Sequence, residues 1–105
     1  MKAEYTSFVC HDDPAKGSAQ KRLDHLVEHL AYIEKFCERI LVAGPLYNKD
    51  GTTINGSLFI YATNDQEKAR SWLEKDPYFK AGFWATVDCR PFYGAIGTAV
   101  GGINY

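Results

Sequence analysis

The chain has 105 residues and a mass of 11.8 kDa, a length that fits one domain and leaves no room for a second. Its formal net charge of −1 lacks the basic excess of nucleic-acid-binding domains. No apolar run approaches the roughly 20 residues that a membrane span needs. Hydrophobic residues make up 46% of the chain, enough for a packed core. We therefore expect a folded protein that binds neither nucleic acid nor membrane.

Two features indicate the compartment. The N-terminal segment has a single lysine and lacks the apolar stretch of a secretory signal. The three cysteines, Cys10, Cys37 and Cys89, are widely spaced and form no C-x-x-C motif, which favours reduced thiols over a disulfide framework. Both features predict a cytoplasmic protein.

The first half of the sequence predicts a strand, a loop, a helix and a second strand. Residues 3–10 are rich in aromatic and β-branched residues, and residues 11–19 have the composition of a turn-forming loop. Residues 20–37 predict an amphipathic helix, because apolar residues recur at steps of three and four and face a core. A short apolar run at residues 39–46, closed by Gly-Pro, predicts the second strand. The helix stripe comprises Leu23, Leu26, Val27, Leu30, Ile33, Phe36 and Cys37.

The next segment predicts a turn, a third strand and a second helix. Residues 48–51 have hairpin-turn composition, and residues 56–63 are typical of a strand. Asn64 and Glu67 have the spacing of a capping box, which predicts a helix from Asn64 to about Lys75.

The last segment predicts a fourth strand and a separate tail. Asp76 precedes Pro77, which disfavours helical backbone angles at Asp76 and ends the second helix. Residues 83–93 alternate as a strand. Residues 94–105 contain four of the nine glycines and no charged residue, which predicts a flexible arm or a strand added to a neighbour. We divide the chain into a domain at 1–93 and a glycine-rich tail at 94–105.

This order of elements predicts an α+β fold, the ferredoxin-like βαββαβ arrangement with a four-stranded antiparallel sheet. Both helices would cover one face of the sheet. The other face would carry residues such as Phe59, Tyr61 and Trp84, or their alternates, and would be bare in a monomer. An exposed apolar face of that size predicts a homodimer in which two sheets pack together around a barrel-like interior.

Three residues of the first helix fit a metal motif. His25, Glu28 and His29 match the H-x-x-E-H pattern, in which two histidines hold zinc and the glutamate acts as a base. A catalytic zinc also needs a third protein ligand, and Glu28 turns towards the polar side of the helix. Proteases with this motif are far larger than this chain. We expect no metal here, and metal analysis decides the alternative.

The helical wheel favours His29 over His25 as a functional residue. His29 lies at the edge of the apolar stripe, and Arg22 lies two turns earlier on nearly the same line, so both face the rim of the core. A cleft can form there. The ordinary alternative is a histidine at the core edge that bonds to the backbone.

Three other positions supply polar candidates. Asp76 is held in an extended conformation, and Ser57 begins a strand with its hydroxyl available to a ligand. A carboxylate of Asp12 or Asp13 could hold Arg22 in place. Each has an ordinary alternative. Asp76 would only end a helix, Ser57 would be a serine at a strand edge, and the Asp12-Asp13 pair would only shape the loop.

Taken together and in order, these residues resemble the YCII-related family (YciI-like proteins) over about residues 3–93. That family has a dimeric α+β barrel fold, and one characterised activity within it is a dehydrochlorinase that acts on a chlorinated hydroxyhydroquinone in aromatic degradation. The matching positions are the D-x-P at 12–14, Arg22, His29-Leu30-Ala31-Tyr32, Ala43-Gly44-Pro45-Leu46, Gly56-Ser57, Asp76-Pro77-Tyr78 and Arg90-Pro91-Phe92.

The resemblance implies a catalytic dyad. His29 would be the general base that removes a proton from the substrate. Asp76 would orient the imidazole and stabilise the imidazolium, and Pro77 would fix the direction of Asp76.

The resemblance also implies a group that stabilises negative charge. Arg22 and Ser57 would donate hydrogen bonds to the developing oxyanion, and Asp12 would hold Arg22. Two departures matter. The loop before Arg22 is longer than in many relatives, which leaves Asp12 and Asp13 as alternatives. Relatives often carry an arginine where this chain has Leu26.

The resemblance and the residues together predict an enzyme that uses acid–base chemistry without a cofactor. It would be a lyase, dehydrochlorinase-like, or an isomerase, acting on a small oxygenated ring compound. The alternative is a non-catalytic protein of the same dimeric barrel fold that binds a small ligand or serves an accessory role.

Overall fold

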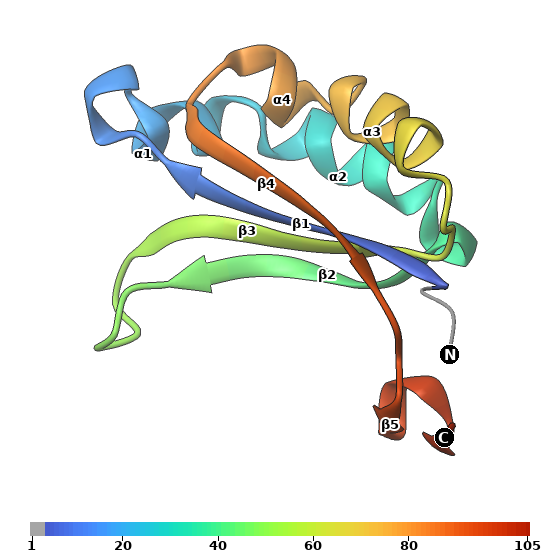
Figure 1. Ribbon diagram of the computed structural model, residues 1–105. Helices are drawn as coiled ribbons and strands as arrows, with labels where there is room; N and C mark the ends of the chain where they lie inside the picture. The colour runs from blue at the N-terminus through green and yellow to red at the C-terminus, as the bar shows by residue number, and fades with distance from the viewer. Residues whose placement is uncertain (1–3) are drawn as a thin grey trace.

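A four-stranded antiparallel sheet carries the α-helices on one face, and the C-terminal tail lies on the other side (Figure 1). The computed structural model describes residues 4–105. The sheet consists of β1 (Tyr5–Asp12), β2 (Ile40–Tyr47), β3 (Ile54–Tyr61) and β4 (Trp84–Phe92). The helices are α1 (Ser18–Asp24), α2 (Leu26–Glu34), α3 (Gln66–Glu74) and α4 (Pro77–Ala81).

The strand order is β2-β3-β1-β4, and each neighbouring pair is antiparallel. The helices α1 and α2 connect β1 to β2, a hairpin joins β2 to β3, and α3 and α4 connect β3 to β4. This arrangement confirms the predicted βαββαβ fold with its helices on one face. The predicted start of the first strand at residue 3 lies outside the described residues.

The core lies between the sheet and the helices and is built from strand residues that alternate. Phe8 and Cys10 of β1 are fully buried, and Phe59 and Tyr61 of β3 are only 2% and 1% exposed. Since neighbouring residues point to opposite faces of a strand, their alternates Val9, Leu58 and Ile60 lie on the open face. The sequence left open whether Phe59, Tyr61 and Trp84 or their alternates lie on the open face, and the alternates are the residues that lie there. Phe59, Tyr61 and Trp84 belong to the covered core.

The prediction of one continuous helix over residues 20–37 is wrong, because the segment is divided into α1 and α2 at His25. The hydroxyl of Tyr78 donates to the backbone carbonyl of Arg22 at 2.9 Å. In a continuous helix that carbonyl would accept from the amide of Leu26, so a side chain inserted here explains the break. The break lets α1 and α2 present different residues to the sheet.

The apolar stripe of this segment is also less buried than predicted. Leu23 is 68% exposed and Val27 is 80% exposed, while Leu26 and Leu30 are about half-buried. Aromatic residues from the strands and from α4 fill the core instead, and the helix stripe borders a pocket. Ile33 is the member of the stripe that packs against the core.

The second helix, α3, begins later than predicted and ends where the sequence predicted, with Lys75 as its C-cap. Its N-cap is Asp65, whose side chain accepts from the amide of Lys68, so the predicted capping box at Asn64 is wrong by one residue. The helix ends before Asp76 as predicted, but Asp76 also caps the short helix α4, which begins at Pro77 and was not predicted. Proline at the first helical position has its backbone angle already set for a helix, which explains why α4 begins there.

The tail folds on itself. Two-residue strands β5 (Ile96–Gly97) and β6 (Gly102–Ile103) flank a 3-10 turn. Asn104 stabilises the hairpin, because its side-chain amide donates at 3.0 Å to the carbonyl of Gly94 before β5 and to that of Val100 in the turn. Gly94 is required where the tail leaves β4, since a side chain there would collide with Val100 and Tyr5.

Candidate active site

A histidine of α2 and a buried aspartate at the start of α4 meet where these two helices are in contact. Asp76, the N-cap of α4, is fully buried, and one of its oxygens, Oδ1, lies 2.7 Å from Nδ1 of His29. The same oxygen accepts the backbone N–H of Tyr78 at 2.9 Å, so capping of α4 also fixes the carboxylate. A carboxylate can only accept, so Nδ1 of His29 carries the proton and neutral His29 keeps its lone pair on Nε2.

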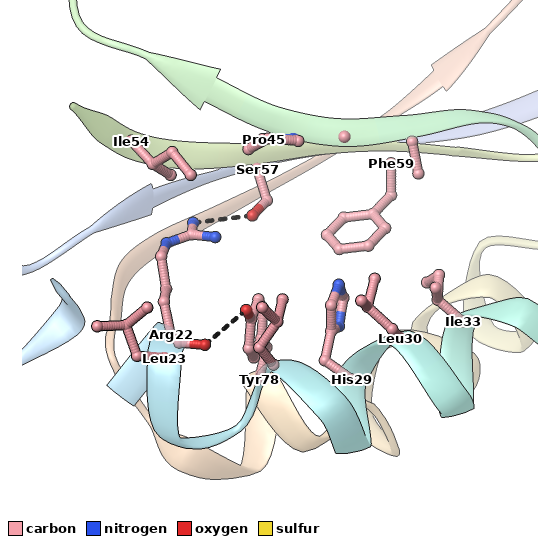
Figure 2. A pocket seen from close by; sticks show the side chains of 13 residues that line it. Arg22, Leu23, His29, Leu30, Ile33, Pro45, Ile54, Ser57, Phe59 and Tyr78 are labelled. Atoms are coloured by element: carbon pink, nitrogen blue, oxygen red, sulfur yellow. Dashed lines mark hydrogen bonds between the residues drawn. The ribbon is translucent and has the colours of Figure 1, made fainter. Parts of the chain in front are cut away.

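Aromatic rings hold the imidazole in place. Tyr78 stacks on His29 with ring centroids 3.9 Å apart and planes inclined by 2°. Phe59 meets the ring edge-on, with centroids 6.4 Å apart. With Nδ1 bonded to Asp76, Nε2 is the nitrogen that remains free, and Figure 2 shows the ring standing upright in a pocket beneath Phe59.

The second polar group of the site is a buried ion pair. Arg22 donates from Nε and Nη2 to the two oxygens of Asp12, at 2.7 and 2.8 Å. Their side chains are 10% and 3% exposed. Asp13 caps the 3-10 turn after β1, where it accepts from the amide of Ala15. The partner of Arg22 is therefore Asp12, which decides the alternative that the sequence left open.

The same guanidinium reaches the first residues of β3. Nη2 of Arg22 also donates to the carbonyl of Gly56 at 2.8 Å and to the hydroxyl oxygen of Ser57 at 2.9 Å (Figure 2). Among residues 4–105 no acceptor bonds to Nη1 of Arg22 or takes the proton of the Ser57 hydroxyl. Both residues line the pocket, so these donors are available to an oxygen atom bound there.

Tyr78 links the two polar groups. Its ring covers His29, its amide holds Asp76, and its hydroxyl donates to the backbone of Arg22. Burial raises the pKa of Tyr78, so the hydroxyl stays protonated and remains a donor. Sequence reasoning did not assign Tyr78 a role. The signal was the Asp-Pro pair before it, which is typical of an N-cap followed by a helix and was interpreted as a helix end.

The pocket has a volume of about 330 Å³ and lies between α1–α2 and strands β2 and β3. Its polar lining comes from Arg22, His29, Ser57 and Tyr78. The other lining residues are apolar: Leu23, Leu26, Leu30, Ile33, Ala43, Gly44, Pro45, Ile54 and Phe59. Figure 2 shows His29 between Arg22 on one side and Leu30 and Ile33 on the other.

The structure therefore places the predicted residues in two neighbouring sets. His29 and Asp76 form one pair, with Pro77 at the first position of α4. Arg22, Ser57 and Asp12 form the other set.

The zinc alternative finds little geometric support. His25 lies 3.7 Å from Glu28 in a pair whose side chains are 37% and 67% exposed, while His29 points Nδ1 at Asp76. Within the described part of the chain, no three His, Cys, Asp or Glu side chains gather closely enough to hold a metal ion.

The chain belongs to the YCII-related family, whose domain model matches residues 6–93. It is 30% identical over 92 residues to Protein YciI of Escherichia coli O6:H1, covering 81% of this chain and 94% of that protein. An uncharacterised protein of Haemophilus influenzae is 32% identical over 92 residues, again covering 81% of this chain and 94% of that protein. In residues 4–105 no helix is both long enough and apolar enough to cross a membrane.

A solved structure extends the similarity to an enzyme. The 5-chloro-2-hydroxyhydroquinone dehydrochlorinase (TftG) of Burkholderia phenoliruptrix AC1100, in complex with 2,5-dihydroxybenzoquinone, superposes with a TM-score of 0.74 and 30% identity. The match covers 90% of this chain and 96% of that one. The chain therefore shares its fold with an enzyme that removes hydrogen chloride from an oxygenated ring.

Proposed function

We propose that the protein is a lyase, similar to a dehydrochlorinase, that uses His29 and Asp76 to remove a proton from a small oxygenated ring compound. The observation that carries this proposal is the fully buried carboxylate of Asp76 at 2.7 Å from Nδ1 of His29. It leaves Nε2 as a base within the pocket and supports the imidazolium that forms when the proton is taken.

The proposed chemistry begins at a carbon next to a ring carbonyl, as in the keto form of a hydroxylated ring. Nε2 of His29 takes the proton, and the C–H electron pair forms a C=C bond while the carbonyl oxygen becomes negative. The negative charge then returns to re-form the C=O bond, the C=C pair shifts towards the next carbon, and chloride departs with its bonding pair. The sum is loss of hydrogen chloride. Without a leaving group, reprotonation at another carbon gives an isomer.

Arg22 and Ser57 would stabilise the oxyanion in this scheme. The free Nη1 protons of Arg22 and the hydroxyl proton of Ser57 are donors available to one oxygen in the pocket. The ion pair with Asp12 fixes the guanidinium before the substrate arrives, so no reorganisation is needed during the reaction. None of these steps requires a cofactor.

The test is turnover of chlorinated hydroxyhydroquinones, measured as chloride release, by the wild type and by His29→Asn and Asp76→Asn. Asp76→Asn keeps the size of the side chain and His29→Asn replaces the imidazole with a smaller neutral amide; each is expected to lower turnover by about 100- to 10,000-fold. The matched control is His25→Asn, four residues earlier at a position that does not line the pocket, which should keep full turnover. Equal turnover in all four proteins contradicts the dyad. Tight binding without turnover in the wild type favours a non-catalytic ligand-binding protein.

We also propose that the open face of the sheet forms a homodimer, as expected from the sequence. Val9, Leu58 and Ile60 lie on that face, and Phe92 at the end of β4 is 38% exposed. Sedimentation of Ile60→Lys should give a monomer where the wild type gives a dimer. Val27→Lys, on the exposed side of α2, is the control and should leave the dimer intact. A monomeric wild type contradicts this part of the proposal.

A further inference from the structure

We infer that the ring compound bound by this pocket is uncharged and carries a short apolar substituent, such as an alkyl group, on the side away from its reacting oxygen. The inference rests on the function proposed above and specifies its substrate class. It follows from three properties of the pocket: the balance of charge, the position of the polar atoms and the size.

The charge balance disfavours an anionic ligand. Arg22 is the one cationic side chain among the described residues that line the pocket. Its charge is matched by Asp12, which binds it through both oxygens in a buried pair. Asp76 places a second carboxylate directly behind His29. Two carboxylates therefore lie beside one guanidinium, so a carboxylate or phosphate on the ligand would be desolvated without a counter-ion of its own.

The polar atoms are gathered on one side of the pocket. Arg22 and Ser57 bind one another beside Ile54, and His29 stands next to them (Figure 2). Beyond His29 the walls are apolar, formed by Leu30 and Ile33 of α2, and Phe59 of β3 lies across from the imidazole (Figure 2). A hydroxyl in that part would lose its hydrogen bonds to water and gain none from the walls. An alkyl group there gains about fourfold in affinity for each buried methylene.

The size of the pocket limits the substituent. A volume of about 330 Å³ lies near the lower end of the range for small-molecule sites, roughly 300 to 1,000 Å³. This space suits one ring with a short side chain and is too small for a fused polycyclic compound. At the mouth Leu26 and Leu30 are 40% and 44% exposed, so the apolar lining continues to the surface.

The test compares three hydroquinones that differ in one ring substituent: hydrogen, propyl and carboxylate. Calorimetry at neutral pH should show propylhydroquinone binding at least tenfold more tightly than hydroquinone, and 2,5-dihydroxybenzoate binding more weakly than both. Binding of the carboxylate as tightly as the propyl compound, or no binding of any of the three, overturns the inference.

A substitution in the wall sharpens the comparison. Leu30→Lys adds a cation to the apolar side and should reverse the order, so that 2,5-dihydroxybenzoate gains about tenfold and propylhydroquinone loses about tenfold. Val27→Lys adds the same charge on α2 at a position that is 80% exposed and does not line the pocket, and it should keep the wild-type order. The same order in Leu30→Lys as in the wild type also overturns the inference.

The two proposals fail in different ways. If the binding order holds but chlorinated hydroxyhydroquinones with and without an alkyl group are left intact, the substrate class stands as a ligand class and the lyase proposal fails. If the wild type releases chloride but prefers rings with a carboxylate, the lyase proposal stands and the substrate class is overturned.

Discussion

The two faces of the sheet use similar residues in different surroundings. On the covered face the Arg22–Asp12 pair is nearly inaccessible to water, with side chains 10% and 3% exposed. On the open face Arg90 and Asp88 form a pair of the same chemistry, with side chains 73% and 52% exposed. Attraction between charges depends on how much water surrounds them, so the first pair acts as a fixed structural unit and the second contributes little. The buried ion pair therefore lies on the covered face, and the pair on the open face is exposed to water.

The largest expected effect tests this difference directly. Arg22→Met leaves the buried carboxylate of Asp12 without its partner, and it should lower the free energy of unfolding by about 3–5 kcal/mol. Arg90→Met is the matched control on the open face and should cost less than about 1 kcal/mol. Urea denaturation of the two variants measures both values. Similar losses in both proteins would contradict the distinction between the faces.

A smaller effect is expected in alkaline solution. Burial raises the pKa of the Cys10 thiol, on the covered face, from 9.0 to about 12. Above pH 9 the unfolded chain loses this proton while the folded chain keeps it, so stability is complete below pH 9 and falls as the pH rises towards 12. At pH 11 the loss is on the order of 2 kcal/mol.

Cys10→Ala removes this contribution, so its unfolding free energy should fall less steeply between pH 9 and pH 11 than that of the wild type. Cys37→Ala is the control, because Cys37 is exposed and its substitution should leave the slope unchanged. Urea unfolding at each pH gives the slopes. A Cys10→Ala slope equal to that of the wild type would show that the thiol titrates normally in the folded protein.

The smallest effect concerns the residue that joins the two polar groups. Tyr78→Phe keeps the ring stacked on His29 but removes the hydroxyl that donates to the carbonyl of Arg22. We expect the free energy of unfolding to fall by about 1 kcal/mol. The slope of that free energy against urea concentration should stay unchanged. Tyr47→Phe, on an exposed ring at the end of β2, should have no measurable effect. An equal loss in both variants would contradict the linking role of Tyr78.

The sequence predicted the strands and helices in their succession along the chain, because alternation and turn composition are local signals. It also predicted that His29 and Asp76 would act together, through the family resemblance and not through spacing, since 47 positions separate them. The break at His25 was not predictable, because it follows from a hydroxyl contributed by Tyr78, 56 positions away from Arg22. The same holds for the exposed helix stripe, whose burial depends on how closely the helices approach the sheet.

The choice between Asp12 and Asp13 shows a similar limit. Adjacent carboxylates look alike in a sequence, and only the fold shows that one caps a turn while the other faces Arg22. The helix α4 was missed because a proline after an aspartate was interpreted as an end, although the same pair begins a helix when the aspartate side chain accepts the third residue's amide.

The central claim is that Asp76 holds the proton of His29 on Nδ1 and leaves Nε2 free as a base. Long-range ¹H–¹⁵N correlation spectra of the imidazole at neutral pH measure this directly, with His25→Asn used to assign the signals. We predict that His29 is in the Nδ1–H form in the wild type and moves towards the Nε2–H form in Asp76→Asn. An Nε2–H form of His29 in the wild type would contradict the claim.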